Sequence, residues 1–494
     1  MSQSATVNSN SFPSGRPVVF RNATVLTIDP SLGMIESGDV LVIANRIAGV
    51  GQQLVVPENA VEIDASGGIL MPGMVDTHRH MWQTALRGFG ADWTLTNYFM
   101  FYYINWGKIF RAEDIYAGNL LSAIEAVDSG VTTTVDWSHG LQTVEYADAA
   151  VDALEAVPGR FVLAYGNLLG APWEWTKAPE FADFIRRRID GRGDMLRMQL
   201  AFDVTGDPAF PEKAAFEVAR DFNLPVTTHA GVWGATNDDG IRLMHENGFM
   251  TPSTIYVHAT TLSHDSYHRI AATGGHASVS AESEQNAGQG YPPTWILRRH
   301  NIPVSLSMDT SVWWSADLFS AMRATLNADR SREHLEAHNR NETVMLSHLR
   351  AEQVVTWATL GGAQALGMDS IIGSITPGKK ADLVLIKNDE SPVMFPLLHP
   401  YGHVVFQAGR GDVHTVMVDG KVVKYDHHLL DVDLAKAKQT VMKTVEYAQS
   451  QMGEQAWNES MNPEKAKVEY IDNPYKYTER ERDKAAQNQA SQES

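Results

Sequence analysis

Several polar residues of this chain stand where short apolar runs end, and their types suit metal binding. His78 and His80 are one residue apart in the run MVDTHRH, and His229 and Asp309 end two later runs. Along a strand, residues i and i+2 point to the same side, so His78 and His80 can bind one ion together. His229 and Asp309 can complete a set of three histidines and one aspartate. The chain has no cysteine, which leaves His, Asp and Glu as the ligands for such an ion.

These polar positions belong to a repeating pattern of strands and helices. Between residues 71 and 368, short apolar runs recur about 30 residues apart, with helical or loop stretches between them. The runs are MVDTHRH, TTTVDWSH, RFVLAYGN, RMQLAFDV, PVTTHA, TIYVHA, HASVSA and PVSLSMD. Eight strands alternating with helices predict an α/β fold, a (β/α)8 TIM-type barrel. Catalytic groups of such barrels lie at the C-terminal ends of the strands, where the candidate ligands stand.

The two ends of the chain differ from this middle part. Residues 18–70 and 369–430 contain β-branched runs that alternate with turn residues, which predicts one composite β-sandwich domain formed by both segments. The barrel domain then covers residues 71–368. Residues 1–17 are expected to be a flexible leader. In residues 431–494, apolar side chains recur at three- and four-residue steps, which predicts an amphipathic helix followed by a polar tail.

Two other histidine pairs compete as metal ligands. His264 and His268 are four residues apart, as are His334 and His338, and this spacing also suits two ligands on one helical face. Both pairs fall in the connecting helices rather than at strand ends. We therefore expect them to be exposed helical side chains.

Four motifs resemble those of a known family. They are PGMVDTHRH at 72–80, GVTTT at 130–134, ATLGGA at 358–363 and GSITPGKKADL at 373–383. In this order they are similar to the amidohydrolase superfamily, in the branch of cytosine and guanine deaminases and s-triazine hydrolases. The resemblance extends over residues 18–423.

The resemblance implies a hydrolase with one divalent metal ion. His78, His80, His229 and Asp309 would hold the ion, and His258, which ends the sixth strand, would contact the water or the substrate. Two-metal members of the superfamily bridge their ions with a carboxylated lysine that ends strand four, whereas this chain has FDV at that place. Zn²⁺ suits these ligands, and Fe²⁺ or Mn²⁺ would also fit. Because such an ion lowers the pKa of water to about 7, Asp309 could take a proton from the attacking water.

One position departs from the pattern of the branch. Its deaminases usually carry a Glu three positions after the strand-five histidine, and that Glu shuttles protons to a ring nitrogen. This chain has Val232 there, which cannot carry a proton. We predict that Glu282 or Glu284, in the loop after strand seven, supplies the missing carboxylate, with Glu284 as a catalytic residue beside Asp309 and His258. The alternative is that both are solvated loop acids.

Aromatic residues are concentrated after the strand ends. Most of the 12 tryptophans stand there, among them Trp82, Trp93 and Trp313. We expect these three to bind a flat, apolar or heteroaromatic substrate, with Gln83 as an amide contact. Arg87 could neutralise an acidic group, whereas Arg79 should point away from His78 and His80. Part of the aromatic run at 98–103 could instead pack in an oligomer interface, and we expect a homo-oligomer.

The charge of the chain excludes other partners. With 40 Lys+Arg against 59 Asp+Glu, the formal net charge is −19, and no basic cluster is present. Nucleic acid and anionic membrane surfaces are therefore not expected as partners. No apolar h-region begins the chain and no run of about 18 apolar residues occurs, so we expect a cytoplasmic protein.

The pattern as a whole predicts a mononuclear metal-dependent hydrolase. It would cleave a non-peptide C–N bond of a small aromatic or heterocyclic compound, by deamination or by hydrolysis of a cyclic amide or amidine. A dechlorinase or decarboxylase on the same scaffold remains an alternative, because loops rather than ligands decide between these reactions. A metal-free relative that acts in assembly or binding is a further alternative, against which the intact ligand set weighs.

Overall fold

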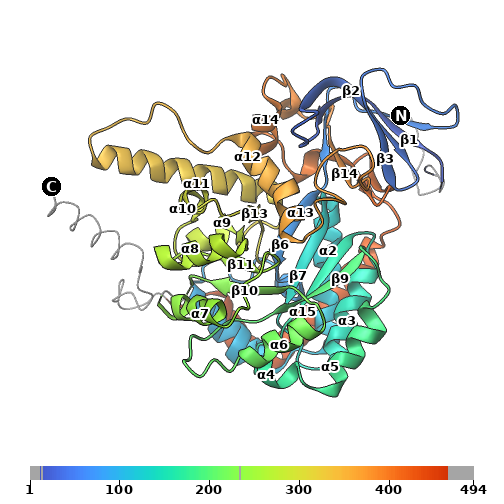
Figure 1. The fold of residues 1–494 in the computed structure, drawn as a ribbon. Helices are drawn as coiled ribbons and strands as arrows, with labels where there is room; N and C mark the ends of the chain where they lie inside the picture. Colours follow the sequence, from blue (N-terminus) through green and yellow to red (C-terminus); the bar gives the residue numbers. More distant parts are fainter. Residues whose placement is uncertain (1–11, 13–14, 233–234, 465–494) are drawn as a thin grey trace.

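The computed structural model describes residue 12 and residues 15–232 and 235–464 (Figure 1). Its centre is a sheet of parallel strands, and each of the eight predicted runs overlaps one of them. They are β6 (Met74–Arg79), β7 (Val131–Ser138), β8 (Arg160–Tyr165), β9 (Leu196–Ala201), β10 (Val226–Ala230), β11 (Ile255–His258), β12 (His276–Val279) and β13 (Val304–Leu306). They pair in chain order from β6 to β13. The prediction of a (β/α)8 barrel is therefore confirmed.

The barrel closes where the first strand meets the last. The amide of Asp309 donates to the carbonyl of His78 at 3.0 Å, and the amide of His80 donates to the carbonyl of Asp309 at 2.7 Å. Three of the candidate ligands are thus fixed to one another through their own backbones. This closure lies at the C-terminal ends of β6 and β13.

Helices surround the barrel strands (Figure 1). Those in the barrel region are α1 (Leu95–Phe99), α2 (Ala112–Asp128), α3 (Val144–Glu155), α4 (Pro172–Trp175), α5 (Pro179–Phe184), α6 (Lys213–Asp221), α7 (Ala235–Glu246), α8 (His264–Thr273), α9 (Ala281–Asn286), α10 (Thr294–Arg299), α11 (Leu318–Asn339), α12 (Ala351–Thr356) and α13 (Gly362–Ala365). Every residue of β7 and β8 is buried, as expected for strands covered on both faces. Side chains that include Val135, Val162 and Val257 fill the interior of the barrel, so it is a packed core.

The predicted composite domain is one sheet made from both ends of the chain. Its strands are β1 (Val18–Leu26), β2 (Met34–Ile43), β3 (Arg46–Gly51), β4 (Val61–Asp64), β5 (Ile69–Pro72), β14 (Leu383–Ile386), β15 (Val413–Val418), β16 (Lys421–Tyr425) and β17 (His428–Leu429). The antiparallel pair β5 and β14 joins the two segments. The sheet is not wholly antiparallel, because β1 pairs in parallel with β4 and β5. β4 and β5 follow the β2–β3 hairpin in the chain, and both run in the same direction as β1. Along the chain, the helix α14 (Pro400–Phe406) comes between β14 and β15.

A buried ion pair joins the barrel to this sheet. The guanidinium of Arg160, at the start of β8, donates two hydrogen bonds of 3.1 Å to Asp382, just before β14. It also donates to the carbonyl of Asp194 at 3.0 Å. Arg160 and Asp382 are both buried. Each buried charge in this contact between the barrel and the sheet is therefore balanced by charge of the opposite sign.

The predicted amphipathic helix is present as α15 (Leu434–Met452), and α16 (Glu454–Met461) follows it. Thr444 of α15 donates to Asp114 of α2 at 2.8 Å, so the helix packs against the barrel. The indole of Trp93 donates to the carbonyl of Ser460 in α16 at 2.7 Å. Most of the predicted leader and of the polar tail lies outside the described residues. Among the described helices, none is both long and apolar enough to cross a membrane.

Candidate metal centre and substrate cavity

Four histidines and one aspartate meet at the C-terminal ends of the barrel strands. The ring of His78 lies 4.6 Å from that of His80, 5.0 Å from His229 and 5.6 Å from His258, measured between ring centroids. The Oδ1 atom of Asp309 lies 3.3 Å from Nε2 of both His78 and His80. The structure thus brings together all four predicted ligands and the predicted strand-six histidine.

The donor atoms of this cluster fit a metal ion. Ligand atoms of His78, His80 and Asp309 lie within 4.8 Å of one another, as do those of His78, His229 and His258. His78, which belongs to both groups, is 0% exposed; its Nδ1 has no partner, and its Nε2 lies 3.3 Å from Oδ1 of Asp309 without forming a well-aligned hydrogen bond. Buried polar atoms are rarely left unpaired in a protein. An ion at this place would give the His78 ring the partner that the protein does not provide.

Hydrogen bonds from the surrounding chain orient these rings. Nδ1 of His80 lies 2.8 Å from the carbonyl oxygen of Trp137, and Nδ1 of His229 lies 2.9 Å from Oδ1 of Asp203. Asp203 also accepts the backbone amide of His229 at 2.9 Å. A histidine whose Nδ1 is held in this way presents its other nitrogen to a metal in a fixed direction.

Asp309 is positioned from two sides. Its Oδ2 accepts a hydrogen bond of 2.5 Å from the hydroxyl of Ser283, which leaves Oδ1 facing the histidines. Its backbone has φ 66°, in the left-handed region, and His258 has φ 68°. Non-glycine residues seldom adopt this conformation, and those that do are often found at functional sites.

The electrostatics of the cluster favour neutral His78 and His80 rings beside an ionised Asp309, whereas the carboxylate of Asp203 outweighs burial and raises the pKa of His229. Burial lowers the pKa of His80 to about 4 and lowers the pKa of His78 as well. Burial alone would raise the pKa of Asp309, but the adjacent His78 and His80 outweigh it, so the pKa falls below its usual range. Neutral imidazole and charged carboxylate are the forms that bind metal ions.

The two glutamates predicted to supply a carboxylate have different positions. Glu284 lies in the short helix α9, not in a loop, and it is fully buried. Its Oε1 lies 3.4 Å from Nδ1 of His258 and accepts the amide of Ser280 at 2.8 Å. Glu282 instead accepts a hydrogen bond from Ser315 and does not line the cavity. The alternative that Glu284 is a solvated acid is therefore wrong.

A cavity of about 460 Å³ opens above the cluster. Its inner end contains His80, His139, Asp203, His229, His258 and Asp309, and its wall is mostly aromatic or aliphatic. Tyr98 and Trp313 stack in this wall with centroids 5.3 Å apart and planes inclined by 23°. Phe99, Tyr103 and Val232 also line it. The predicted aromatic wall is therefore present, with Trp313 in it.

Three predicted substrate contacts lie behind the wall rather than in it. Trp82 and Trp93 are buried and do not line the cavity, because they pack against other aromatic side chains, with Tyr102 near both. Gln83 is also buried, and its amide is already used: it donates to the Tyr98 hydroxyl at 2.7 Å and accepts from Thr310 at 2.8 Å. These side chains support the residues that face the substrate.

The two arginines considered as anion partners also lie outside the cavity. Arg79 is buried and donates to Ser122 at 2.7 Å and to Glu125 at 2.9 Å, so it points away from the histidines as predicted. Arg87 pairs with Glu125 too, which corrects the expectation that it could meet an acidic substrate group.

The competing histidine pairs lie in connecting helices, as expected. His264 and His268 are in α8, and His334 and His338 are in α11. Nδ1 of His264 lies 3.1 Å from Nε2 of His300, so His264 has a partner that the sequence did not indicate.

Some cavity residues had no role in the sequence-based prediction. Gln289 and Thr310 line the cavity from loops that the strand pattern does not place. Asp203 and His139 follow barrel strands, where polar residues carry function, but no role was assigned to either side chain.

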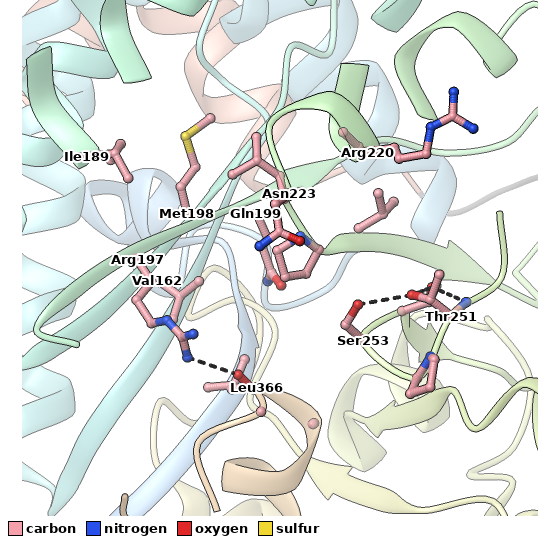
Figure 2. A pocket seen from close by; sticks show the side chains of 18 of the residues that line it. Val162, Ile189, Arg197, Met198, Gln199, Arg220, Asn223, Thr251, Ser253 and Leu366 are labelled. Atoms are coloured by element: carbon pink, nitrogen blue, oxygen red, sulfur yellow. Dashed lines mark hydrogen bonds between the residues drawn. The ribbon is translucent and has the colours of Figure 1, made fainter. Parts of the chain in front are cut away.

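A second cavity, of about 790 Å³, lies at the opposite end of the barrel. Its lining includes Val226 and His276, the first residues of β10 and β12, and none of the histidine cluster. Figure 2 shows Arg197, bonded to the carbonyl of Leu366 at 3.2 Å, on one side, and Ser253 on the other. The N-terminal face of a barrel usually serves stability rather than catalysis.

Comparison with known protein families matches residues 69–423 to the amidohydrolase family. The chain is 27% identical over 443 residues to a 5'-deoxyadenosine deaminase of Methanosarcina mazei, and the match covers 87% of this chain and 98% of that protein. It is 28% identical over 450 residues to a 5-methylthioadenosine/S-adenosylhomocysteine deaminase of Desulforudis audaxviator, covering 87% and 99%.

Two solved structures share the fold. A variant of the atrazine chlorohydrolase of Arthrobacter aurescens TC1, in complex with zinc and atraton, has a TM-score of 0.75 at 18% identity and covers 87% of this chain and 100% of that chain. An adenosine deaminase of Xanthomonas campestris with bound zinc has a TM-score of 0.73 at 22% identity, covering 89% and 100%. The resemblance seen in the sequence motifs is thereby confirmed. The chain belongs to the amidohydrolase family and is a hydrolase that acts on carbon–nitrogen bonds other than peptide bonds.

Proposed function

We propose that this chain binds one divalent ion through His78, His80, His229 and Asp309 and uses it to hydrolyse a C–N bond of a small aromatic or heterocyclic compound. Zn²⁺ is the proposed ion, and Fe²⁺ or Mn²⁺ would fit the same donors. The observation that carries the proposal is the buried His78 ring, whose nitrogens make no well-aligned hydrogen bond although four other potential ligands surround it. Asp203 at the end of strand four bonds to His229, which favours one ion over a bridged pair.

The bound ion would supply a water molecule of lowered pKa and a Lewis acid beside the reacting carbon. The chain's own groups must then move the protons. We assign the proton of the attacking water to the carboxylate of Asp309, whose Oδ1 faces the histidines and whose Oδ2 is held by Ser283. From this carboxylate, the proton would pass to the leaving nitrogen.

His258 would polarise the attacked centre from the cavity side. Because its Nδ1 faces Glu284, its Nε2 is the atom left to contact the substrate or the water. Glu284 would act through His258, holding the ring and balancing the charge it gains. This pair is our proposed replacement for the carboxylate that is absent at Val232, a residue that lines the same cavity.

The first reaction to test is deamination. The two curated relatives carry the names of deaminases of adenosine derivatives. The aromatic wall suits a flat ring above the histidines. Hydrolysis of a cyclic amide or amidine uses the same groups, while dechlorination and decarboxylation remain alternatives on this scaffold. We also keep two predictions that rest on the sequence, a cytoplasmic location and a homo-oligomer.

A substrate screen tests the proposal. Metal-replete protein is incubated with amino-heterocycles, cyclic amides and chlorinated triazines, and ammonia, ring-opened product and chloride are measured separately. We expect ammonia or ring-opened product, and Asp309→Asn should remove that activity. Chloride release alone would favour the dechlorinase. No product from any class, together with protein that binds no metal, would favour the non-enzymatic relative.

A further inference from the structure

The charged groups of the substrate cavity are unevenly distributed. Among the described residues that line it, none is Lys or Arg. Its inner end holds the carboxylates of Asp203 and Asp309, and Glu284 lies just behind His258. The chain as a whole carries a net charge of −19. Beyond the ion at its inner end, the cavity therefore offers no cation to an anionic substituent of a substrate.

The outer part of the cavity cannot solvate a charge well. Leu95, Phe99, Met100, Ile104 and Trp313 contribute aliphatic or aromatic surface there. An anion that loses water without gaining a cation or hydrogen-bond donors binds poorly. A flat uncharged ring, in contrast, gains from contact with such a wall.

The wall also offers a small polar spot. The Tyr98 hydroxyl accepts a hydrogen bond from Gln83 and lies 3.4 Å from Nε2 of His139. Tyr98 and His139 both line the cavity. A neutral hydroxyl and a neutral ring can meet a polar atom of an uncharged substrate, but they do not balance an anion.

We propose that this cavity selects flat, uncharged aromatic compounds and rejects analogues that carry an anionic group away from the reacting carbon. The inference rests on the proposed function, because it places the reacting carbon at the histidine cluster. It also distinguishes between the compounds that appear in the names of the relatives. Neutral nucleosides such as 5'-deoxyadenosine fit it, whereas S-adenosylhomocysteine, with its carboxylate, does not.

A matched pair of probes tests the proposal without requiring turnover. Dissociation constants of 2-aminopyrimidine, which is neutral at pH 7, and of its 5-carboxylate are measured by calorimetry with zinc-loaded, full-length protein. We expect the uncharged compound to bind at least about tenfold more tightly. Equal affinities, tighter binding of the carboxylate, or no detectable binding of either compound would overturn the proposal. Ammonia is measured in the same samples. If the uncharged probe bound selectively but released none, the selectivity would stand and the proposed deamination would lose support.

A lysine introduced at the mouth of the cavity tests whether the missing cation causes the selectivity. Met100 lines the cavity and is 53% exposed, so a lysine there can reach a bound carboxylate without disturbing the core. We expect Met100→Lys to bind the carboxylate probe about tenfold more tightly than Met100→Leu, the matched variant that keeps an apolar side chain at this position. If Met100→Lys left that affinity unchanged while still binding the uncharged probe, the missing cation would not explain the selectivity.

Discussion

Asp203 lets the positioning of a proposed ligand be tested quantitatively. Its carboxylate makes two hydrogen bonds of 2.9 Å to His229, one to Nδ1 and one to the backbone amide. Asp203→Asn keeps the shape of the side chain and an oxygen for the amide. It removes the charge that holds the ring, and a charged hydrogen bond of this kind is worth about 1.5 to 3 kcal/mol.

Only part of that energy should be lost, because asparagine can still accept one hydrogen bond. We therefore expect metal affinity to fall about 10- to 100-fold, which corresponds to about 1.4 to 2.7 kcal/mol. The Kd for Zn²⁺ is measured by competition with a chromogenic chelator. Asp207→Asn is the matched control, because Asp207 lies in the same loop, is exposed, and its carboxylate accepts only the amide of Ala209 among the described contacts. A Kd for Asp203→Asn within about threefold of the wild-type value would refute the reasoning.

Three further outcomes follow from the structure. Glu284→Gln should lower kcat at least about tenfold with metal content unchanged, whereas Glu282→Gln should retain most of the activity, as measured on the substrate found by screening. Asp382→Asn removes one carboxylate from the buried Arg160 but leaves those of Asp194 and Asp419, so it should lower the free energy of unfolding by about 1 to 2 kcal/mol in denaturant titrations. Trp313→Ala removes half of the stacked pair with Tyr98, so kcat/KM should fall about tenfold or more with little change in metal content.

The strand pattern was enough to predict where the chemistry lies. Each apolar run became a barrel strand because both faces of a barrel strand are buried, which restricts its residue types strongly. His78, His80, His229 and Asp309 then met because the C-terminal ends of parallel strands lie at one face. The composite sheet was likewise indicated by its β-branched runs, although the parallel pairing of β1 was not.

The substrate contacts were predicted less well, because loops rather than strands position them. Trp82, Trp93 and Trp313 look alike in the sequence, yet only Trp313 faces the cavity. The indole of Trp93 is bonded to Ser460, more than 300 residues later in the chain, a contact that no local pattern reveals. A position just after a strand end predicts that a residue lies near the site. It does not predict whether an aromatic ring faces the cavity or packs behind its wall.

The central claim is that these histidines and Asp309 form a site for one metal ion. Its most direct test is elemental analysis of protein purified without chelator, comparing the wild type with a His78→Ala/His80→Ala variant whose folding is checked by circular dichroism. We expect about one divalent ion per wild-type chain and less than about a tenth of an ion in the folded variant. Wild-type protein with less than about a tenth of an ion, or a variant that retains the full amount, would contradict it.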